Sequence, residues 1–269
     1  MSETSRHDAW QAGANYDAYM GRWSRKVAPL FLDWLKAPDN GDWLDVGCGT
    51  GSLSQAILAG AAPASVTGID ASEGFVRHAA ATIADPRVRF QRGDAQAIDL
   101  ADASRDAVVS GLVLNFVPDK RAMLSEMARI ARPGGSLGFF VWDYPGGGIA
   151  FMRAFWRAAG ALDPDAAALA EDRRFPGCTE AGLRGLAAEV WGTGVETTAL
   201  EVPTRFRDFA DYWTPFTLGA GPAPGYCVSL SPDRREQLRR KLESDLPREP
   251  DGSILLSARA WAVKAVGPG

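Results

Sequence analysis

Trp43-Leu-Asp-Val-Gly-Cys-Gly-Thr-Gly-Ser-Leu-Ser54 is the stretch of the sequence that decides the fold. An apolar run enters a turn with glycine at alternate positions and leaves it as an amphipathic segment, a pattern that predicts strand, tight turn and helix. Gly47, Gly49 and Gly51 carry no Cβ atom, so the turn can adopt positive φ and a ligand can approach its backbone. We predict a capping box over residues 52–55, with the helix N-terminus facing the space above the turn. A polar, nucleotide-like ligand is the expected occupant.

The composition is typical of a soluble globular protein. The chain has 269 residues, of which 46% are hydrophobic and 23% charged, and a formal net charge of −4. Nucleic acid is not an expected partner, because binding to phosphates needs a positive field. Cys48, Cys178 and Cys227 are too few and too widely spaced for a disulfide framework or a metal cluster, so we expect no metal and a reducing compartment. We find no apolar leader and no membrane-length window, and therefore expect a cytoplasmic protein without a membrane partner.

The hydrophobic period alternates regularly between that of strands and that of helices after the glycine turn. Strand, helix, strand at this spacing predicts right-handed crossovers and a doubly wound parallel α/β sheet, which binds ligands at the carboxyl ends of its strands. The predicted strands are 65–70, 88–91, 107–110 and 136–142, and the predicted helices are 24–36, 52–60, 72–83 and 119–130.

The chain beyond residue 142 departs from this rhythm. Helices are expected at 149–162 and 179–190, and a final strand at 253–266 is expected to pair antiparallel with a strand at 195–202. Seven aromatic residues there either form an apolar acceptor pocket or pack the insertion onto the sheet: Phe151, Phe155, Trp156, Phe209, Tyr212, Trp213 and Phe216. We divide the chain into an N-terminal flap and helix (1–40), a binding core (41–142), a lid insertion (143–194) and C-terminal strands (195–269) with a lid segment at 205–245.

An aspartate lies at the end of each of three predicted strands. Asp45 precedes the glycine turn, Asp70 ends the second strand and Asp94 follows the third. A carboxylate about twenty residues after such a turn can bind both hydroxyls of a ribose held over it. Each acid alone has an alternative explanation as a turn or cap residue, but three at corresponding positions favour a nucleotide site.

These motifs resemble class I S-adenosylmethionine (SAM) dependent methyltransferases over about residues 40–142. Leu44-Asp45-Val46-Gly47-Cys48-Gly49-Thr50-Gly51 resembles the first motif of the family, and Gly68-Ile-Asp-Ala-Ser72 and Gly93-Asp94-Ala95 resemble its ribose and adenine motifs. The resemblance implies a Rossmann-like seven-stranded sheet whose last strand is antiparallel and lies between the fifth and the sixth. Within the family, the chain is most similar to small-molecule enzymes that include quinone methyltransferases.

The resemblance also implies which residues form the site. It assigns SAM binding to Asp45, Gly47, Gly49, Gly51, Asp70, Ala71, Asp94, Ala95 and Ser110. Asn115, Trp142 and Tyr144 directly follow the fourth and fifth strands and are expected to line the acceptor site. The His-His pair that relatives often carry after the fourth strand is Asn115-Phe116 here, so no catalytic base is assigned. His7 and His78 are interpreted as surface residues.

The expected function is SAM-dependent transfer of a methyl group to a small, partly aromatic or apolar acceptor by in-line displacement. One alternative is a methyltransferase-like protein that binds SAM or a partner without catalysis. A more remote alternative is an NAD-dependent oxidoreductase, since a glycine-rich turn and Asp70 would serve either cofactor. Two details disfavour NAD: Ser52 replaces the glycine or alanine of that fingerprint, and the Asp45 carboxylate would repel a pyrophosphate.

Overall fold

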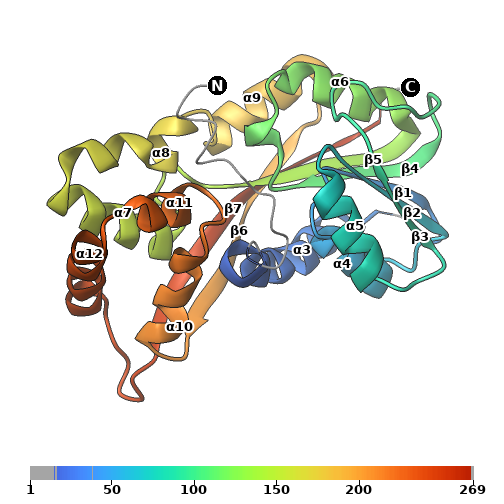
Figure 1. The fold of residues 1–269 in the computed structure, drawn as a ribbon. Coiled ribbons are helices and arrows are strands. Elements are labelled where there is room, and N and C mark those ends of the chain that lie inside the picture. The colour runs from blue at the N-terminus through green and yellow to red at the C-terminus, as the bar shows by residue number, and fades with distance from the viewer. Residues whose placement is uncertain (1–14, 16, 38, 268–269) are drawn as a thin grey trace. The chain divides into compact units, whose positions relative to one another are not determined.

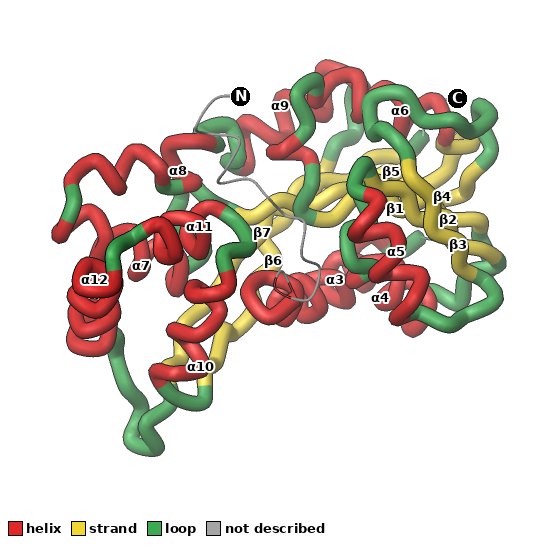
Figure 2. The backbone as a smooth tube through the Cα atoms, viewed as in Figure 1, coloured by secondary structure: helices red, strands yellow, loops and turns green. Residues whose placement is uncertain are grey.

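The computed structural model describes residues 15, 17–37 and 39–267, and the predictions for the segment before residue 15, including His7, lie outside these residues. Its centre is a seven-stranded sheet with the order β3-β2-β1-β4-β5-β7-β6 (Figures 1 and 2). The strands are β1 (Asp42–Val46), β2 (Ser65–Asp70), β3 (Val88–Arg92), β4 (Arg105–Gly111), β5 (Ala131–Trp142), β6 (Glu196–Phe206) and β7 (Ile254–Val266).

The pairing of the strands confirms the predicted fold class. β1 pairs in parallel with β2 and β4, and β2–β3 and β4–β5 are also parallel. β7 pairs antiparallel with β5 and lies between β5 and β6 in the sheet. The carboxyl ends of β1, β2 and β3 therefore meet at one edge, which is where a doubly wound sheet binds its ligand.

Helices occupy most of the connections between the strands, whereas β3 and β4 are joined by a loop. Ser72, Asp119, Thr179 and Ser231 are residue types that favour the N-cap, and each caps a helix by accepting the backbone amide three residues further on. The helices are α3 (Arg22–Leu35), α4 (Ser52–Gly60), α5 (Glu73–Thr82), α6 (Lys120–Ile130), α7 (Ala150–Leu162), α8 (Glu171–Arg174), α9 (Glu180–Trp191), α10 (Phe209–Trp213), α11 (Pro222–Ser229) and α12 (Pro232–Asp245), with short turns η1 (Asp17–Gly21), η2 (Leu114–Phe116), η3 (Pro164–Leu169) and η4 (Thr214–Leu218).

Two local predictions were wrong. The capping box at residues 52–55 does not form, because Gly51 precedes α4 in the left-handed conformation and no side chain caps the helix from that position. The strand predicted at 136–142 begins earlier, because β5 starts at Ala131 and includes Arg132–Gly135. The pairing with β4 shifts register across these residues, so the Pro-Gly-Gly sequence is accommodated as an irregularity of the strand rather than as its boundary.

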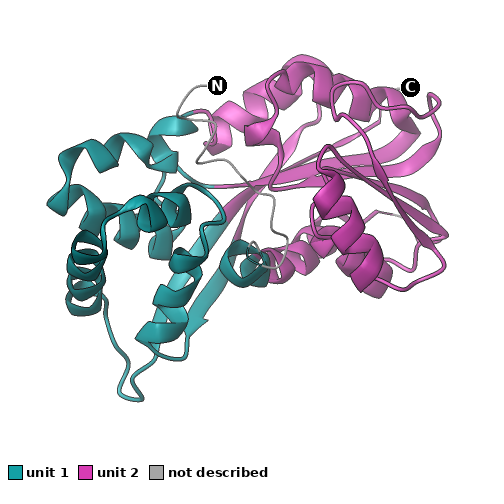
Figure 3. Cartoon of the chain, in the orientation of Figure 1, with its two compact units in different colours: residues 1–23, 143–176, 201–259 teal, residues 24–142, 177–200, 260–269 magenta. Residues whose placement is uncertain are grey.

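The chain divides into two compact units (Figure 3). Unit 2 comprises residues 24–142, 177–200 and 260–269, and unit 1 comprises residues 1–23, 143–176 and 201–259. Unit 2 contains β1 to β5 with α3 to α6, and its interior is aliphatic along β4, whereas β1 also buries Trp43. None of the helices in the described residues is long and apolar enough to cross a membrane.

The interior of unit 1 is aromatic. Phe155 stacks on Phe216 with ring centroids 4.4 Å apart, and Tyr212 donates its hydroxyl to the Phe151 carbonyl at 2.8 Å. Tyr19 from η1 contacts Phe216 edge-on at 5.3 Å. These rings are fully buried against one another, so they act as core residues of unit 1.

Candidate functional site

The site in unit 2 begins with a buried carboxyl group on β1. Asp45 is fully buried, and its Oδ2 accepts a hydrogen bond from the Ser54 hydroxyl at 2.7 Å. The backbone amide of Ser54 also donates to this carboxyl group, so Asp45 supplies the cap at the start of α4 that the predicted capping box does not. Its Oδ1 has no partner among the described residues. Burial raises the pKa of Asp45 to about 7.

The glycine turn that follows contacts the segment after β4 and is hydrogen-bonded to β2. Gly47 has φ +72°, and a Cβ atom there would lie 2.5 Å from a methyl carbon of Val113, in the segment after β4. The amides of Gly47 and Cys48 both donate to the Ile69 carbonyl at 2.8 Å. Gly49 has φ +54°, but a Cβ atom there would meet no atom within 4 Å. The turn is therefore fixed to β2 and open at Gly49.

Asp70 connects this turn with the next two strand ends. Its Oδ2 accepts the Gly49 amide at 3.0 Å, and its Oδ1 accepts the Ser72 amide at 2.8 Å. The Asp70 carbonyl accepts the amide of Gly93, the residue before Asp94, at 3.0 Å. Partial burial raises the pKa of the Asp70 carboxyl. The structure thus brings together the ends of β1, β2 and β3, as the sequence motifs predict.

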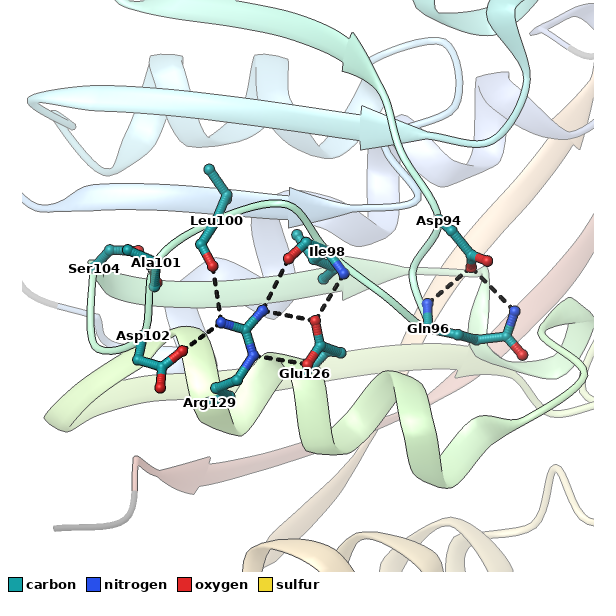
Figure 4. Close-up of polar contacts among 9 residues, drawn as sticks. All are labelled: Asp94, Gln96, Ile98, Leu100, Ala101, Asp102, Ser104, Glu126 and Arg129. Atoms are coloured by element: carbon teal, nitrogen blue, oxygen red, sulfur yellow. Dashed lines mark hydrogen bonds and ion pairs between the residues drawn. The ribbon is translucent and has the colours of Figure 1, made fainter.

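Asp94 is exposed, and a polar network orders the loop that carries it (Figure 4). Its Oδ1 accepts the Gln96 backbone amide at 2.9 Å and the Gln96 side-chain amide at 3.0 Å, and these bonds lower its pKa. Glu126 of α6 accepts the Ile98 amide at 2.7 Å, while Arg129 donates to the Ile98 carbonyl at 2.9 Å. Helix α6 therefore holds the loop that follows Asp94.

The remaining predicted residues have different surroundings. Ser110 donates its hydroxyl to the Val46 carbonyl at 2.7 Å and so ties β4 to β1. Asn115 lies in η2 and is buried, yet both atoms of its side-chain amide lack a partner among the described residues. Trp142 ends β5, and its Nε1 is likewise unpartnered in this part of the chain. Ala71 is exposed and Ala95 is half-buried, each directly after its aspartate.

Tyr144 belongs to unit 1, where its ring contacts Phe175 with centroids 5.2 Å apart. It lines a cavity of that unit together with Trp156 and Glu171. Sequence reasoning missed Glu171, which belongs to no motif, and also Ser54 and Gln96, whose roles depend on contacts to Asp45 and Asp94. Among the described residues, no group of three His, Cys, Asp or Glu side chains is arranged to hold a metal ion.

Residues 44–139 match the family described as a methyltransferase domain. This stretch of the chain therefore matches a methyltransferase domain. The match confirms the resemblance drawn from the sequence, and the matched segment runs from β1 into β5. The site built from Asp45, Gly49, Asp70 and Asp94 lies entirely within it.

Individual relatives of the methyltransferase domain support the same assignment. The chain is 30% identical over 126 residues to malonyl-[acyl-carrier protein] O-methyltransferase of Hahella chejuensis, covering 47% of this chain and 45% of the relative. It is 35% identical over 100 residues to demethylmenaquinone methyltransferase of Roseiflexus sp., covering 37% and 42%. The matches span about half the length of the curated relatives.

A solved structure shares the fold of the whole chain. Phosphoethanolamine N-methyltransferase 2 of Haemonchus contortus, in complex with SAM, aligns with a TM-score of 0.60 at 15% identity, covering 100% of this chain and 60% of that one. At this level of identity, the similarity concerns the fold alone.

Proposed function

We propose that the protein is a SAM-dependent methyltransferase that methylates a small, partly aromatic or apolar acceptor by in-line displacement. One observation carries the proposal: Asp70 accepts the Gly49 amide of the turn, while Asp45, just before the turn, has a buried carboxyl oxygen with no partner among the described residues. A nucleoside joined to a cationic amino acid provides a partner for both groups. SAM is such a molecule.

The residues present fit this cofactor. The Asp70 carboxyl oxygens each accept one backbone amide and retain acceptor capacity for the two ribose hydroxyls. Asp94 is exposed and ionised, so its carboxylate can accept a hydrogen bond from the exocyclic amine of adenine. Ala95, the next residue, lies beside this contact. We assign the α-amino group to Oδ1 of Asp45, directly or through a water molecule. Gly47, Gly49 and Gly51 form the turn against the methionine and ribose, where the open side of Gly49 allows close approach, and Ala71 and Ser110 flank them.

Bound SAM supplies a methyl group activated by a sulfonium centre. The chain's own contribution is to orient the acceptor behind that carbon and to exclude water, and orientation alone can supply about 7–11 kcal/mol. Asn115 and Trp142 are the proposed acceptor contacts in unit 2, because their buried donors and acceptors lack partners among the described residues. No residue is assigned as general base, a function that typically adds only about 10²–10⁴-fold.

The same geometry disfavours the alternative of NAD-dependent oxidation. A pyrophosphate site needs free backbone amides at the turn. Here the amides of Gly47 and Cys48 donate to Ile69, and that of Gly49 donates to Asp70. The carboxyl group of Asp45 adds negative charge at the same place when it is ionised.

The relatives guide the choice of acceptors to test, and the cysteines bear on the cellular compartment. Two relatives are named for O-methylation of malonyl-[acyl-carrier protein] and for methylation of demethylmenaquinone, so acceptors with an apolar or ring-containing body are the first to test. Cys48, Cys178 and Cys227 form no disulfide, which supports a reducing compartment such as the cytoplasm.

The test combines binding and turnover. Calorimetry is used to titrate the protein with SAM and, separately, with NAD, and labelled SAM is incubated with a panel of phenols, quinols, amines and carboxylates. We expect SAM to bind at one site, NAD to produce no heat, and label to appear in at least one acceptor. SAM binding without transfer to any acceptor would favour the non-catalytic alternative, and NAD binding without SAM binding would contradict the proposal.

A further inference from the structure

Unit 1 contains a cavity of about 450 Å³ that the site in unit 2 does not use. This volume lies in the range of about 300–1,000 Å³ that is usual for small-molecule sites. The turn at 143–148, α7, η3 and α8 form its wall. Its interior is apolar on one side, where Ile149, Met152 and Ala170 are all buried.

A buried carboxyl group lies in the wall of this cavity. Glu171, the first residue of α8, is only 4% exposed. Its Oε2 accepts the indole N–H of Trp156 at 2.5 Å, whereas Oε1 has no partner among the described residues. A buried oxygen without a partner costs free energy, and a ligand N–H or O–H group that reaches it would remove that cost. The nearby Tyr144 ring and the Trp156 indole offer flat surfaces to an apolar ligand.

Three arginines surround the same cavity. Arg153, Arg157 and Arg173 are exposed, and none forms an ion pair with a described carboxylate. Arg153 lies over the turn, since a Cβ atom on Gly147 would be 2.7 Å from its Nη1. Asp172 also lines the cavity and accepts the Arg173 backbone amide at 2.8 Å. The rim therefore carries three guanidinium groups against one exposed carboxylate, which favours an anionic ligand group.

We propose that this cavity of unit 1 binds a small molecule with three features: an apolar, ring-containing body, an N–H or O–H donor that reaches Glu171, and a carboxylate, sulfonate or phosphate that the arginines bind. The apolar wall contacts the ring-containing body of the ligand, and the guanidinium groups at the rim bind its anionic group. The inference concerns unit 1 by itself, and it does not depend on methyl transfer in unit 2.

The experiment uses a matched pair of fluorescent probes on the full chain. Toluidinonaphthalene sulfonate has an aromatic body, an N–H donor and an anionic group, whereas toluidinonaphthalene lacks only the sulfonate. We expect one saturable site for each probe and an affinity about tenfold higher for the sulfonate, which is the usual effect of one charge-assisted hydrogen bond. Equal affinities, or several unsaturable sites, would overturn the proposal.

Substitutions then separate the two polar contacts. Arg153→Gln combined with Arg157→Gln should remove the advantage of the sulfonate and leave the neutral probe unaffected. Glu171→Gln should weaken both probes by a similar factor, because both carry the N–H group. Arg205→Gln is the control, since Arg205 is an exposed residue of unit 1 that pairs with Asp251 and does not line the cavity.

Three results would overturn the assignment. The first is unchanged binding of the sulfonate in the double arginine variant, and the second is unchanged binding of both probes in Glu171→Gln. The third is displacement of the sulfonate by S-adenosylhomocysteine, which would place the probe in the methyltransferase domain. All variants change exposed or isosteric side chains, and matching circular dichroism spectra verify that each one is folded.

Discussion

The two units use the same chemical group in different surroundings. Asp45 in unit 2 and Glu171 in unit 1 are both buried, and burial raises the pKa of both to about 7. Each has one oxygen bonded to a neighbouring side chain and the other without a partner in the described part of the chain. Asp45 lies beside the glycine turn, at the edge of the sheet formed by the carboxyl ends of the strands. None of the described residues that bond to it carries a positive charge. Glu171 lies in a wall near three arginines. The comparison teaches that burial prepares a carboxyl group for a ligand, while its neighbours select the charge of that ligand.

The largest expected effect tests whether unit 2 alone binds SAM. Asp70→Ala removes the acceptor of the Gly49 and Ser72 amides together with the proposed ribose contact. We expect calorimetry to show at least about a hundredfold loss of SAM affinity, since each hydrogen bond to a charged group contributes about 1.5–3 kcal/mol.

The matched control for this variant is Asp85→Ala, which removes an exposed ion pair with Arg87 in the same unit. Toluidinonaphthalene sulfonate should bind the Asp70→Ala variant as it binds the wild type. Wild-type SAM affinity in Asp70→Ala would break the assignment of the two sites to the two units.

A second prediction concerns pH. Asp45 is mostly protonated below its pKa of about 7 and ionised above it, so the affinity for a cationic ligand should rise as the pH increases through 7. Between pH 6 and pH 7.5, below the range of about 7.7–8 where α-amino groups lose their proton, we expect SAM affinity to rise about fivefold to tenfold. Asp45→Asn should bind SAM weakly and with no such dependence, and a pH-independent affinity in the wild type would argue against contact with Asp45.

A third prediction sharpens the comparison through stability. The pKa of Glu171 is raised from 4.5 to about 7 in the folded chain, so the unfolded chain ionises first and stability falls as the pH rises from about 4.5 to 7. Glu171→Gln removes this loss, and we expect it to stabilise unit 1 by about 1–2 kcal/mol at pH 7.5 but not at pH 4.5. Urea denaturation at the two pH values measures the difference, and an equal change at both would show that the carboxyl group does not titrate as described.

The smallest effect is expected at Asp94. Two hydrogen bonds from Gln96 already lower the pKa of this carboxylate. Because the carboxylate is also exposed, water competes for its remaining acceptor capacity. Asp94→Asn should weaken SAM binding only about threefold. Gln96→Ala, which frees the loop without removing the carboxylate, serves as the comparison variant. A loss as large as that of Asp70→Ala would mean that Asp94, not Asp70, is the principal contact to the cofactor.

The sequence predicts unit 2 much better than unit 1, for physical reasons. Alternating periods, caps such as Ser72 and Asp119, and the spacing of Asp45 and Asp70 from the glycine turn are local signals, and the sheet converts them directly into neighbours in space. The contact of Ser54 with Asp45 required the register of α4 against β1, which a capping-box pattern at residues 52–55 concealed.

Glu171 illustrates what local signals cannot supply. It lies in a helix of four residues, and its partner Trp156 is on α7, so only the packing of unit 1 shows that the carboxyl group is buried. The aromatic residues of unit 1 were equally ambiguous in the sequence, because core rings and pocket rings have the same composition. Their stacking places Phe155 and Phe216 in the core, while Trp156 lines the cavity.

The most direct test is a crystal structure of the protein with S-adenosylhomocysteine. The account predicts the ribose hydroxyls on Asp70, the adenine amine at Asp94, and the α-amino group at Oδ1 of Asp45, directly or through one water molecule. An adenosyl group bound away from Gly49 and Asp70, or a complex in which Oδ1 of Asp45 still has no partner, would contradict it.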